Sequence, residues 1–377
     1  MSYFSWNRFV AVLVKEFVQM RRDRLTFAMM VGIPIIQLIL FGFAINSDPK
    51  SLPTAVLAAD NSVFARSFVR ALENSGYFRV VRQVTTEREA ERALAVGEAQ
   101  FVLTIPENFS RKLVRGERPV LLLEADASDP AATSNALAAL LNLNQTALAR
   151  DLSGSLAHLQ NAPPPYEVRV QRRYNPEGVT QYNIVPGLIG VILTMTMVMM
   201  TSLAMTRERE RGTMENLLAT PVRPIEVMTG KIIPYIIVGY VQVTIILAAA
   251  KLLFAVPVVG SVVLLSVVLV LFMAANLAVG FTFSTLAKNQ MQAMQMTFFF
   301  FLPSMLLSGF MFPFRGMPEW AQWLGEILPL THFLRVVRGI LLKGNGTVEI
   351  APELWPIAAF LLVAAIVALI RYRETID

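Results

Sequence analysis

The residues able to do chemistry are few, and their types exclude several classes of enzyme. The chain of 377 residues has no cysteine, which excludes disulfides, cysteine–metal sites and thiol catalysis. Its two histidines, His158 and His332, lie far apart in the sequence, which argues against a histidine-rich metal site. The fragment Thr229-Gly230-Lys231 lacks the first glycine of a phosphate-binding loop. Any ATP is therefore expected on a separate polypeptide.

Three aspartates stand at the ends of predicted strands, where open α/β sheets form ligand crevices. They are Asp60, Asp126 and Asp129. The sequences around Asp60 and Asp129 also have the residue types of helix starts, with Ser62 after the first and Pro130 after the second. We expect helix capping in preference to ligand binding.

The stretch TRERERGTMENLLATPVRP, residues 206–224, has the pattern of a docking element. Five alternating charges, Arg207 to Arg211, follow a long apolar run directly, and Gly212 then breaks the chain. Residues 213–219 are expected to form a short amphipathic helix bounded by Pro221 and Pro224. The simpler alternative is a solvated helix end. A short amphipathic helix in a loop favours docking into a groove of a partner protein.

The composition indicates a membrane protein. Hydrophobic residues make up 55% of the chain, charged residues 16%, and the mean hydropathy is +0.53, whereas soluble domains carry about 25% charged residues. The net charge is +6, but Lys and Arg cluster beside apolar runs. No basic face with interleaved aromatic residues occurs, so we expect no nucleic-acid partner.

Apolar runs of about 20 residues predict membrane-spanning helices. Six occur, at 25–47, 184–205 (within 178–206), 232–250, 261–287, 293–313 and 354–370. Short loops on one side carry most Lys and Arg, which places both termini in the cytoplasm. The segment 314–350 on the other side carries four. The first run has no small-residue cleavage site after it and is expected to be an uncleaved signal anchor.

Residues 48–180 have a different composition, with strand and helix patterns in alternation. This alternation predicts an α/β domain with a mostly parallel sheet. Strands are expected at 54–60, 77–84, 99–105, 119–126 and 166–174, and helices at 62–76, 86–98, 107–117 and 130–160. The predicted fold class is an α-helical polytopic membrane protein with six transmembrane helices and an extracytoplasmic α/β domain inserted between helices 1 and 2.

The full predicted order of domains follows from these assignments. A cytoplasmic amphipathic segment (1–24) precedes transmembrane helix 1 (25–47), the α/β domain (48–180), transmembrane helices 2–6 (181–370) and a cytoplasmic tail (371–377). Within 181–370 we expect a cytoplasmic coupling loop at 207–230 and an extracytoplasmic re-entrant hairpin at 314–350.

The predicted spans contain no Asp, Glu, Lys or Arg in their apolar cores, which argues against a proton- or sodium-coupled carrier. Their polar residues are expected to make interhelical hydrogen bonds, with substrate contact as the alternative. Methionine is common at adaptable binding surfaces, so a path for hydrophobic substrates is a second hypothesis beside ordinary lipid contact. Its candidate residues are Met195, Met199, Gln242, Asn276, Phe299 and Phe300. Glu319 or Glu326 could line an outer vestibule.

Two blocks, 206–235 and 307–344, resemble the signature of ABC-2 type transporter permeases, in the drug-efflux-like branch with a large extracytoplasmic domain. The second block contains the run PLTHFLRVVRGILLKG. The resemblance implies that the loop after the second span contacts a separate ATPase subunit, which binds ATP and magnesium. The contact residues it implies are Glu208, Arg209, Glu210, Arg211, Gly212, Thr213, Glu215, Leu217 and Leu218.

The function implied is that of a permease subunit of an ATP-driven exporter in the bacterial cytoplasmic (inner) membrane. It would move a hydrophobic or amphiphilic substrate, drug-like or lipid-like, outwards. We expect no cofactor on this chain, a second permease (identical or a paralogue), membrane lipid around the spans, and a periplasmic adaptor as a further candidate partner. The alternatives are a transmembrane signalling or mechanotransmission protein and an ion-coupled secondary carrier.

Overall fold

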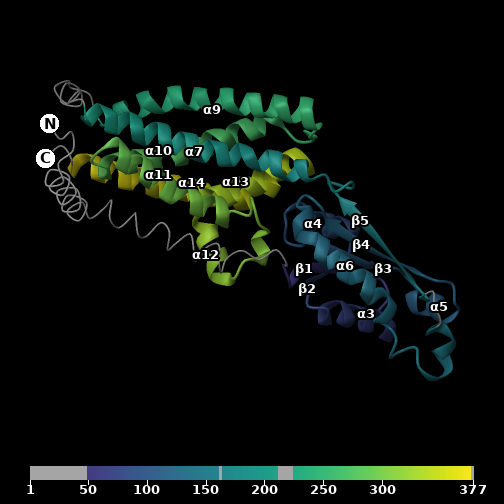
Figure 1. Cartoon of the computed structure of the whole chain (residues 1–377). Helices are drawn as coiled ribbons and strands as arrows, with labels where there is room; N and C mark the ends of the chain where they lie inside the picture. Colours follow the sequence, from purple (N-terminus) through teal and green to yellow (C-terminus); the bar gives the residue numbers. More distant parts are fainter. Residues whose placement is uncertain (1–48, 161–163, 211–223, 375–377) are drawn as a thin grey trace, which may run out of the picture.

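The protein consists of an α/β domain and a bundle of long helices, which lie end to end (Figure 1). The computed structural model describes residues 49–160, 164–210 and 224–374. The predicted segment 1–24 and the predicted first span, 25–47, lie outside the described residues.

The α/β domain is built on one five-stranded sheet. Its order is β2-β1-β3-β4-β5, and only the β3–β4 pair is antiparallel. The strands are β1 (Leu52–Ala58), β2 (Phe78–Val84), β3 (Phe101–Ile105), β4 (Val120–Asp126) and β5 (Glu167–Arg173). They occur in the order expected from the alternating sequence pattern.

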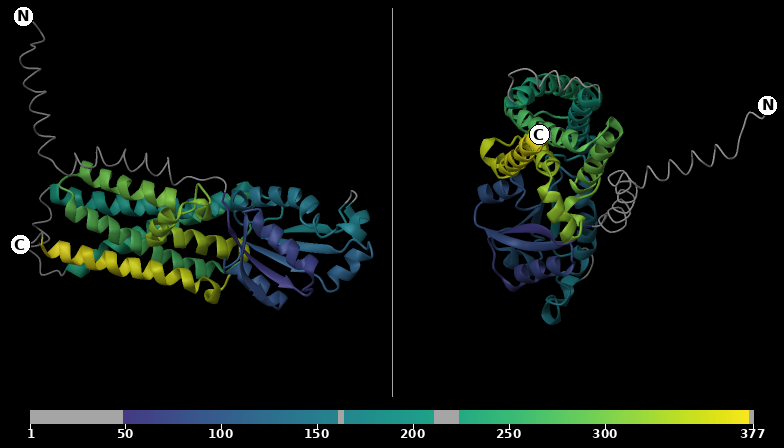
Figure 2. Two further views of the ribbon diagram at one scale, coloured as in Figure 1. Left: turned by 90° about the horizontal axis from the view of Figure 1, so that it is seen from below. Right: turned by 90° about the vertical axis from the view of Figure 1, so that its left-hand side faces the viewer.

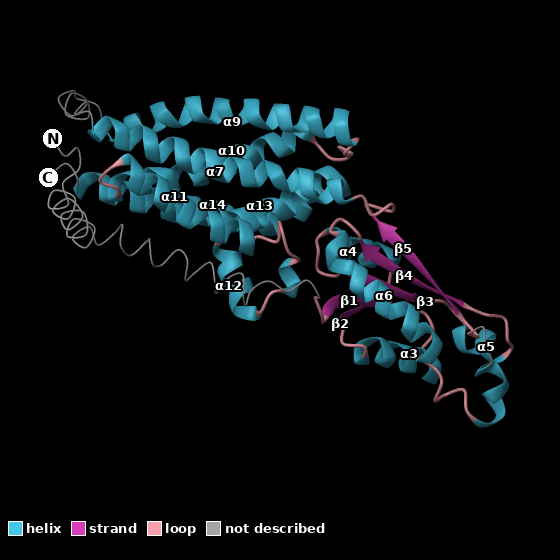
Figure 3. Ribbon diagram, in the orientation of Figure 1, coloured by secondary structure: helices cyan, strands magenta, loops and turns pink. Residues whose placement is uncertain are grey.

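Helices cover both faces of this sheet (Figure 3). The helices are α3 (Val63–Asn74), α4 (Glu87–Ala95), α5 (Phe109–Val114) and α6 (Pro130–Thr146). Because successive side chains of a strand point to opposite faces, Phe101 and Leu103 of β3 pack with α3, α5 and α6, whereas Val102 packs with α4. This burial explains why four of the five residues of β3, all except Thr104, are apolar.

The predicted helix 130–160 is shorter in the structure. Helix α6 ends at Thr146, and the chain resumes a 3₁₀ helix only at Gly154–Gln160. Gly154 adopts a φ of +67°, a left-handed conformation that interrupts a helix and suits glycine. The turn between them folds Leu148 and Leu152 into the core of the domain.

Among the described residues, five long helices form the bundle, with α10 packed against both α7 and α14. They are α7 (Thr180–Glu210), α9 (Pro224–Phe254), α10 (Val262–Leu286), α11 (Gln290–Leu307) and α14 (Thr347–Glu374). Within the described ranges, four segments are long and apolar enough to cross a membrane: Thr180–Arg207, Pro234–Phe254, Val262–Leu286 and Thr347–Arg371. The count of six spans therefore stays a prediction.

Helix α11 differs from the predicted run 293–313. It begins earlier, at Gln290, and ends at Leu307, because Gly309 turns the chain with a φ of +81°. Its first turns carry three glutamines, and it is absent from the four candidate spans found among the described residues.

The segment between α11 and α14 leaves and re-enters the bundle at the end nearest the sheet (Figure 2). It holds a short 3₁₀ turn (Phe314–Gly316), α12 (Glu319–Ile327), α13 (Pro329–Arg338) and a π turn (Gly339–Lys343). Helix α13 packs among α7, α10 and α14, where Phe333 stacks on Phe272 with ring centroids 4.0 Å apart.

Candidate functional site

Helix α7 joins the α/β domain directly to the predicted docking stretch. Strand β5 passes into α7 through a turn closed by two hydrogen bonds of 2.9 Å between the Asn175 amide and the backbone of Val179. The 31 residues of α7 extend about 46 Å at about 1.5 Å per residue. The α/β domain and the charges that begin at Arg207 therefore lie at opposite ends of the bundle (Figure 1).

At the far end of α7, Glu210 ties this helix to the start of α11. Its carboxylate accepts hydrogen bonds from the backbone N–H of Gln290 at 2.8 Å and from the Gln290 amide at 2.5 Å. Arg207 donates to the side-chain oxygen of Gln290 at 3.4 Å. Of the predicted contact residues, only Glu210 has a described side chain. The others, Glu208, Arg209, Arg211, Gly212, Thr213, Glu215, Leu217 and Leu218, have side chains or whole residues outside the described part of the structure.

The six candidate path residues occupy different surroundings. Gln242 accepts a hydrogen bond from Thr196 at 3.1 Å, which links α9 to α7. The buried Asn276 donates to the Phe272 carbonyl at 2.9 Å. The Gln242 contact is interhelical, as expected for polar residues of the spans, whereas the Asn276 contact lies within α10. Met195 packs against the bundle core, and Met199 is half-buried on α7.

The two path phenylalanines of α11 point in different directions. Phe300 lies between Phe283 of α10 and Phe360 of α14, with centroid distances of 6.0 and 6.5 Å. Phe299 is 40% exposed. The six candidate residues therefore do not line one common path in the described structure, and the substrate path stays a prediction.

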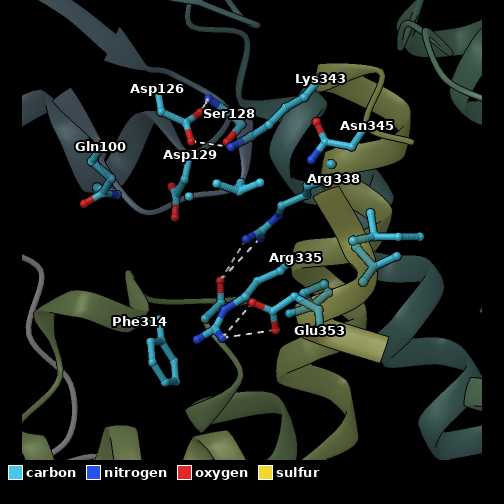
Figure 4. Close-up of a pocket in the computed structure, with 18 of the residues that line it drawn as sticks. Gln100, Asp126, Ser128, Asp129, Phe314, Arg335, Arg338, Lys343, Asn345 and Glu353 are labelled. Atoms are coloured by element: carbon cyan, nitrogen blue, oxygen red, sulfur yellow. Dashed lines mark hydrogen bonds and ion pairs between the residues drawn. The ribbon is translucent and has the colours of Figure 1, made fainter. Parts of the chain in front are cut away.

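A cavity of about 340 Å³ lies where the α/β domain meets the bundle (Figure 4). Its walls come from α4, β4 and the start of α6 on one side and from the 308–353 segment on the other. The charged residues that line it are Asp126, Asp129, Arg315, Glu326, Arg335, Arg338, Lys343, Glu349 and Glu353. Glu326 lines this cavity, whereas Glu319 is exposed and is not part of the lining. That the cavity is an outer vestibule stays a prediction.

An ionic cluster on the bundle side fastens α12, α13 and α14 together. Arg335 contacts Glu326 at 2.5 Å and Glu353 at 3.3 Å. His332, whose side chain is 6% exposed, lies 2.5 Å from Glu353 through Nδ1 and 2.8 Å from the Glu326 carbonyl through Nε2. A carbonyl oxygen only accepts, so Nε2 carries a hydrogen. A second hydrogen is then shared between Nδ1 and the Glu353 carboxylate.

Polar side chains of the 308–346 segment bind the C-terminal end of α4. Lys343 donates to the Leu94 carbonyl at 3.1 Å, Asn345 to the Ala95 carbonyl at 2.9 Å and Arg315 to the Gly97 carbonyl at 2.8 Å. The last carbonyls of a helix have no partner within it and carry its negative dipole end, which favours cations. Lys343 also forms an ion pair with Asp126 at 2.5 Å. The α/β domain is therefore held to the bundle by charged and polar contacts.

The amino-acid sequence matches a known family over almost the whole chain. The profile of the ABC-2 family transporter proteins matches residues 24–370. The chain belongs to this family. It is similar to YbhS of Escherichia coli (strain K12), named as a multidrug ABC transporter permease, with 29% identity over 90% of each chain. It is 28% identical to YbhR of the same strain, which carries the same kind of name, over 98% of this chain and 100% of that one.

A solved structure also matches part of the chain. It is the crystal structure of a domain assigned to an ABC type-2 transporter from Thermotoga maritima MSB8, with 21% identity and a TM-score of 0.26. The match covers 31% of this chain and 84% of that one. With its family and its apolar helices together, this chain is an ABC-2 type permease and a multi-pass membrane protein.

The charged cavity of this ABC-2 permease was not found from the sequence. The segment 314–350 contains four cations, Arg315, Arg335, Arg338 and Lys343. In the sequence they count only as charges of a loop. The positive-inside rule expects few Lys and Arg in a segment predicted outside the cytoplasm. The four cations in 314–350 were therefore the signal in the sequence that could have indicated this cavity. Glu353 also falls one residue before the predicted span 354–370, whereas α14 begins six residues earlier, at Thr347.

Proposed function

We propose that this permease is the membrane subunit of an ATP-driven exporter and that residues 206–224 dock on a separate ATP-binding subunit. The observation that supports this role is the continuity of α7, which runs without a break from the α/β domain to Glu210. Movement of the docking stretch by the partner would be transmitted along one continuous helix. ATP and magnesium belong to the partner in this proposal.

The proposed topology has six spans, with both termini in the cytoplasm of a bacterial inner membrane. The α/β domain then lies outside the cytoplasm, inserted after the span predicted at 25–47. The distribution of Lys and Arg supports this orientation, and so does the placement of the α/β domain and Arg207 at opposite ends of α7. A second permease, identical or paralogous, would complete the transporter, and a periplasmic adaptor is a further candidate partner.

The proposed substrate is hydrophobic or amphiphilic, and it moves outwards. Two similar permeases are named for multidrug transport, which supports drug-like or lipid-like molecules. The lack of Asp, Glu, Lys and Arg in the predicted apolar cores is consistent with a substrate of this kind.

The docking proposal is tested by co-purification of the detergent-solubilised chain with a candidate ATP-binding subunit from the same organism. The test variant is Leu217→Asp, which places a charge on the apolar face of the proposed helix. We expect it to lose the ATP-binding subunit that the unchanged chain retains. Because Glu210 also bonds to Gln290 within this chain, Glu210→Gln serves as a separate variant for the charge at the docking end.

The matched control is Leu141→Asp, an equally apolar and 69% exposed position on α6 of the α/β domain. It should keep the ATP-binding subunit. Equal retention of the ATP-binding subunit by Leu217→Asp and the unchanged chain would reduce residues 206–224 to a charged helix end.

A further inference from the structure

Arg338 differs from the other cations that line the cavity. Lys343 is paired with Asp126, and Arg335 is paired with Glu326 and Glu353. Arg338 has no ion pair among the described residues. Its two Nη atoms donate only to the Gly309 carbonyl, at 3.3 and 3.4 Å, and its buried Nε has no hydrogen-bond partner within the described structure.

A guanidinium in this state is poorly compensated. It carries five N–H donors in a fixed planar fork, and long bonds to one carbonyl satisfy few of them. Removal of a charge from water is costly unless an opposite charge and hydrogen bonds replace the hydration. The fork geometry matches the two oxygens of a carboxylate or phosphate. Figure 4 shows Arg338 reaching from α13 towards the cavity between this helix and the loop that carries Asp129.

We infer that the cavity is a binding site for an anionic group, a carboxylate or phosphate, and that Arg338 is its anchor. The volume of about 340 Å³ is within the range of small-molecule pockets, about 300–1,000 Å³. Apolar side chains of Phe314, Leu334 and Ile350 also line the cavity, so an apolar portion of the same ligand has surface to contact. The lining contains no residue of the docking stretch, so the site is tested without the ATP-binding subunit.

Asp129 is the group in the cavity that would oppose an anion. It accepts a hydrogen bond from Asn183 at 3.2 Å and forms no ion pair with Arg338 among the described contacts. Burial raises the pKa of Asp129 above its ordinary value, and the attraction of Arg338 and backbone hydrogen bonds only partly offset this effect. Of the other carboxylates in the lining, Asp126 is paired with Lys343, and Glu326 and Glu353 are paired with Arg335. Glu349 accepts the Gly346 N–H but has no ion pair among the described contacts, so its charge also opposes an anion.

The test measures anion binding by the purified full chain, without the ATP-binding subunit. One arm titrates inorganic phosphate into the detergent-solubilised protein by calorimetry. The other arm counts bound lipids by native mass spectrometry after reconstitution with phosphatidylglycerol or with phosphatidylcholine. Phosphate binding indicates a soluble anion. Retention of phosphatidylglycerol alone indicates a lipid headgroup.

We expect Arg338→Gln to weaken binding by about tenfold or more, since it removes a charge-assisted bidentate contact. Asp129→Asn should tighten binding severalfold, because it removes the opposing charge. Arg111→Gln is the matched control for the loss of one positive charge, on α5 and away from the lining, and should bind as the unchanged chain does.

Three results would overturn the inference: equal binding by Arg338→Gln and the unchanged chain, weaker binding by Asp129→Asn, or no binding of either probe by the unchanged chain. The second result would mean that Asp129 compensates the charge of Arg338, so that Arg338 is not free to bind a ligand anion. Should Arg338→Gln fail to fold, Arg338→Lys, which keeps the charge but loses the fork, gives the same comparison with a smaller expected loss. None of these results bears on docking, which the co-purification tests separately.

Discussion

Asp60 fixes the starts of two helices with one carboxylate. One oxygen accepts the Ser62 N–H at 2.8 Å, just before α3, and the other accepts the Ser110 N–H at 2.9 Å in the first turn of α5. Ser62 in turn caps α3 through the Ala65 N–H. Burial disfavours the charged form, but these hydrogen bonds outweigh it and hold the pKa of Asp60 below its ordinary value. Its role is the capping role expected from the sequence.

We predict that Asp60→Ala destabilises the starts of α3 and α5 by about 1 kcal/mol, the usual cost of a lost cap. Because the folded pKa is depressed, this stabilisation is present above the unfolded value of about 4 and is lost as the pH falls through the folded pKa. Hydrogen-exchange mass spectrometry of peptides 63–74 and 109–114 measures it. Glu107→Ala, an exposed acid beside α5, is the control, and equal exchange in both variants would contradict the prediction.

Gly280 lies at a close contact between α10 and α7. A Cβ atom at this position would lie 2.6 Å from the Val198 carbonyl oxygen and 2.9 Å from the Thr201 Cβ. The first of these atoms is backbone, so the helices themselves would have to separate. Small residues at helix contacts within membranes permit this kind of packing.

Gly280→Ala should therefore destabilise the bundle by about 1–3 kcal/mol, the range for overpacking. Thermal unfolding in detergent, followed by tryptophan fluorescence, measures the change in Tm. Gly346→Ala is the matched control, because the added methyl group meets only the end of the Glu349 side chain, at 3.2 Å, and no backbone atom. A Tm for Gly280→Ala equal to that of the control would contradict the tight contact.

At the scale of residues, the sequence predicts what depends on near neighbours. Ser62 and Asp60 are recognisable as a helix start because all partners except Ser110 lie within a few positions. Lys343 and Asp126 are 217 residues apart, and no pattern of residue types links them. The cavity depends on such pairs, so it emerges only when the domain and the bundle are placed together.

At the scale of elements, the ionic cluster fixes how α13 sits between α12 and α14. The Arg335 guanidinium also lies 4.7 Å from the centre of the Phe314 ring. Arg335 thus joins three elements: the 3₁₀ turn, the end of α12 and the start of α14. These contacts hold a short helix inside the bundle at its α/β end.

Arg335→Gln should lower stability by about 2 kcal/mol, because it leaves Glu326 and Glu353 close together without the guanidinium between them. Fully buried pairs cost about 3–5 kcal/mol, but Arg335 is 34% and Glu326 42% exposed, and solvent screens the charges. A second change, Glu353→Gln, should restore part of the loss in Tm. A double variant no more stable than Arg335→Gln would contradict a charge-based role.

The elements themselves were predictable to different degrees. Strand and helix order in 49–173 follows from the alternating pattern, but the antiparallel β3–β4 pair does not, because a buried strand has the same composition in either direction. The packing partners of α13 were also not predictable. The sequence predicts a re-entrant hairpin at 314–350, but only the structure shows α13 packed against α7, α10 and α14.

At the scale of the whole molecule, α7 sets the distance between the proposed docking stretch and the charged cavity. The described cations away from the α/β domain include Lys288, between α10 and α11, and Arg207. At the other end, Arg315, Arg335, Arg338 and Lys343 line the cavity. A helix of 31 residues is longer than the roughly 20 residues needed to cross a bilayer, so the two groups of charges can lie on opposite sides of the membrane.

This arrangement predicts opposite labelling of two engineered cysteines. The natural chain has none, so each single variant gives one signal. Ser153→Cys lies at an exposed position of the α/β domain and Lys288→Cys at an exposed position of the far end. In spheroplasts, a membrane-impermeant maleimide should label Ser153→Cys at once and Lys288→Cys only after the membrane is disrupted. Labelling of both in intact spheroplasts would place the two ends on one side, and the reverse pattern would put the α/β domain in the cytoplasm and remove the basis for the proposed direction of transport.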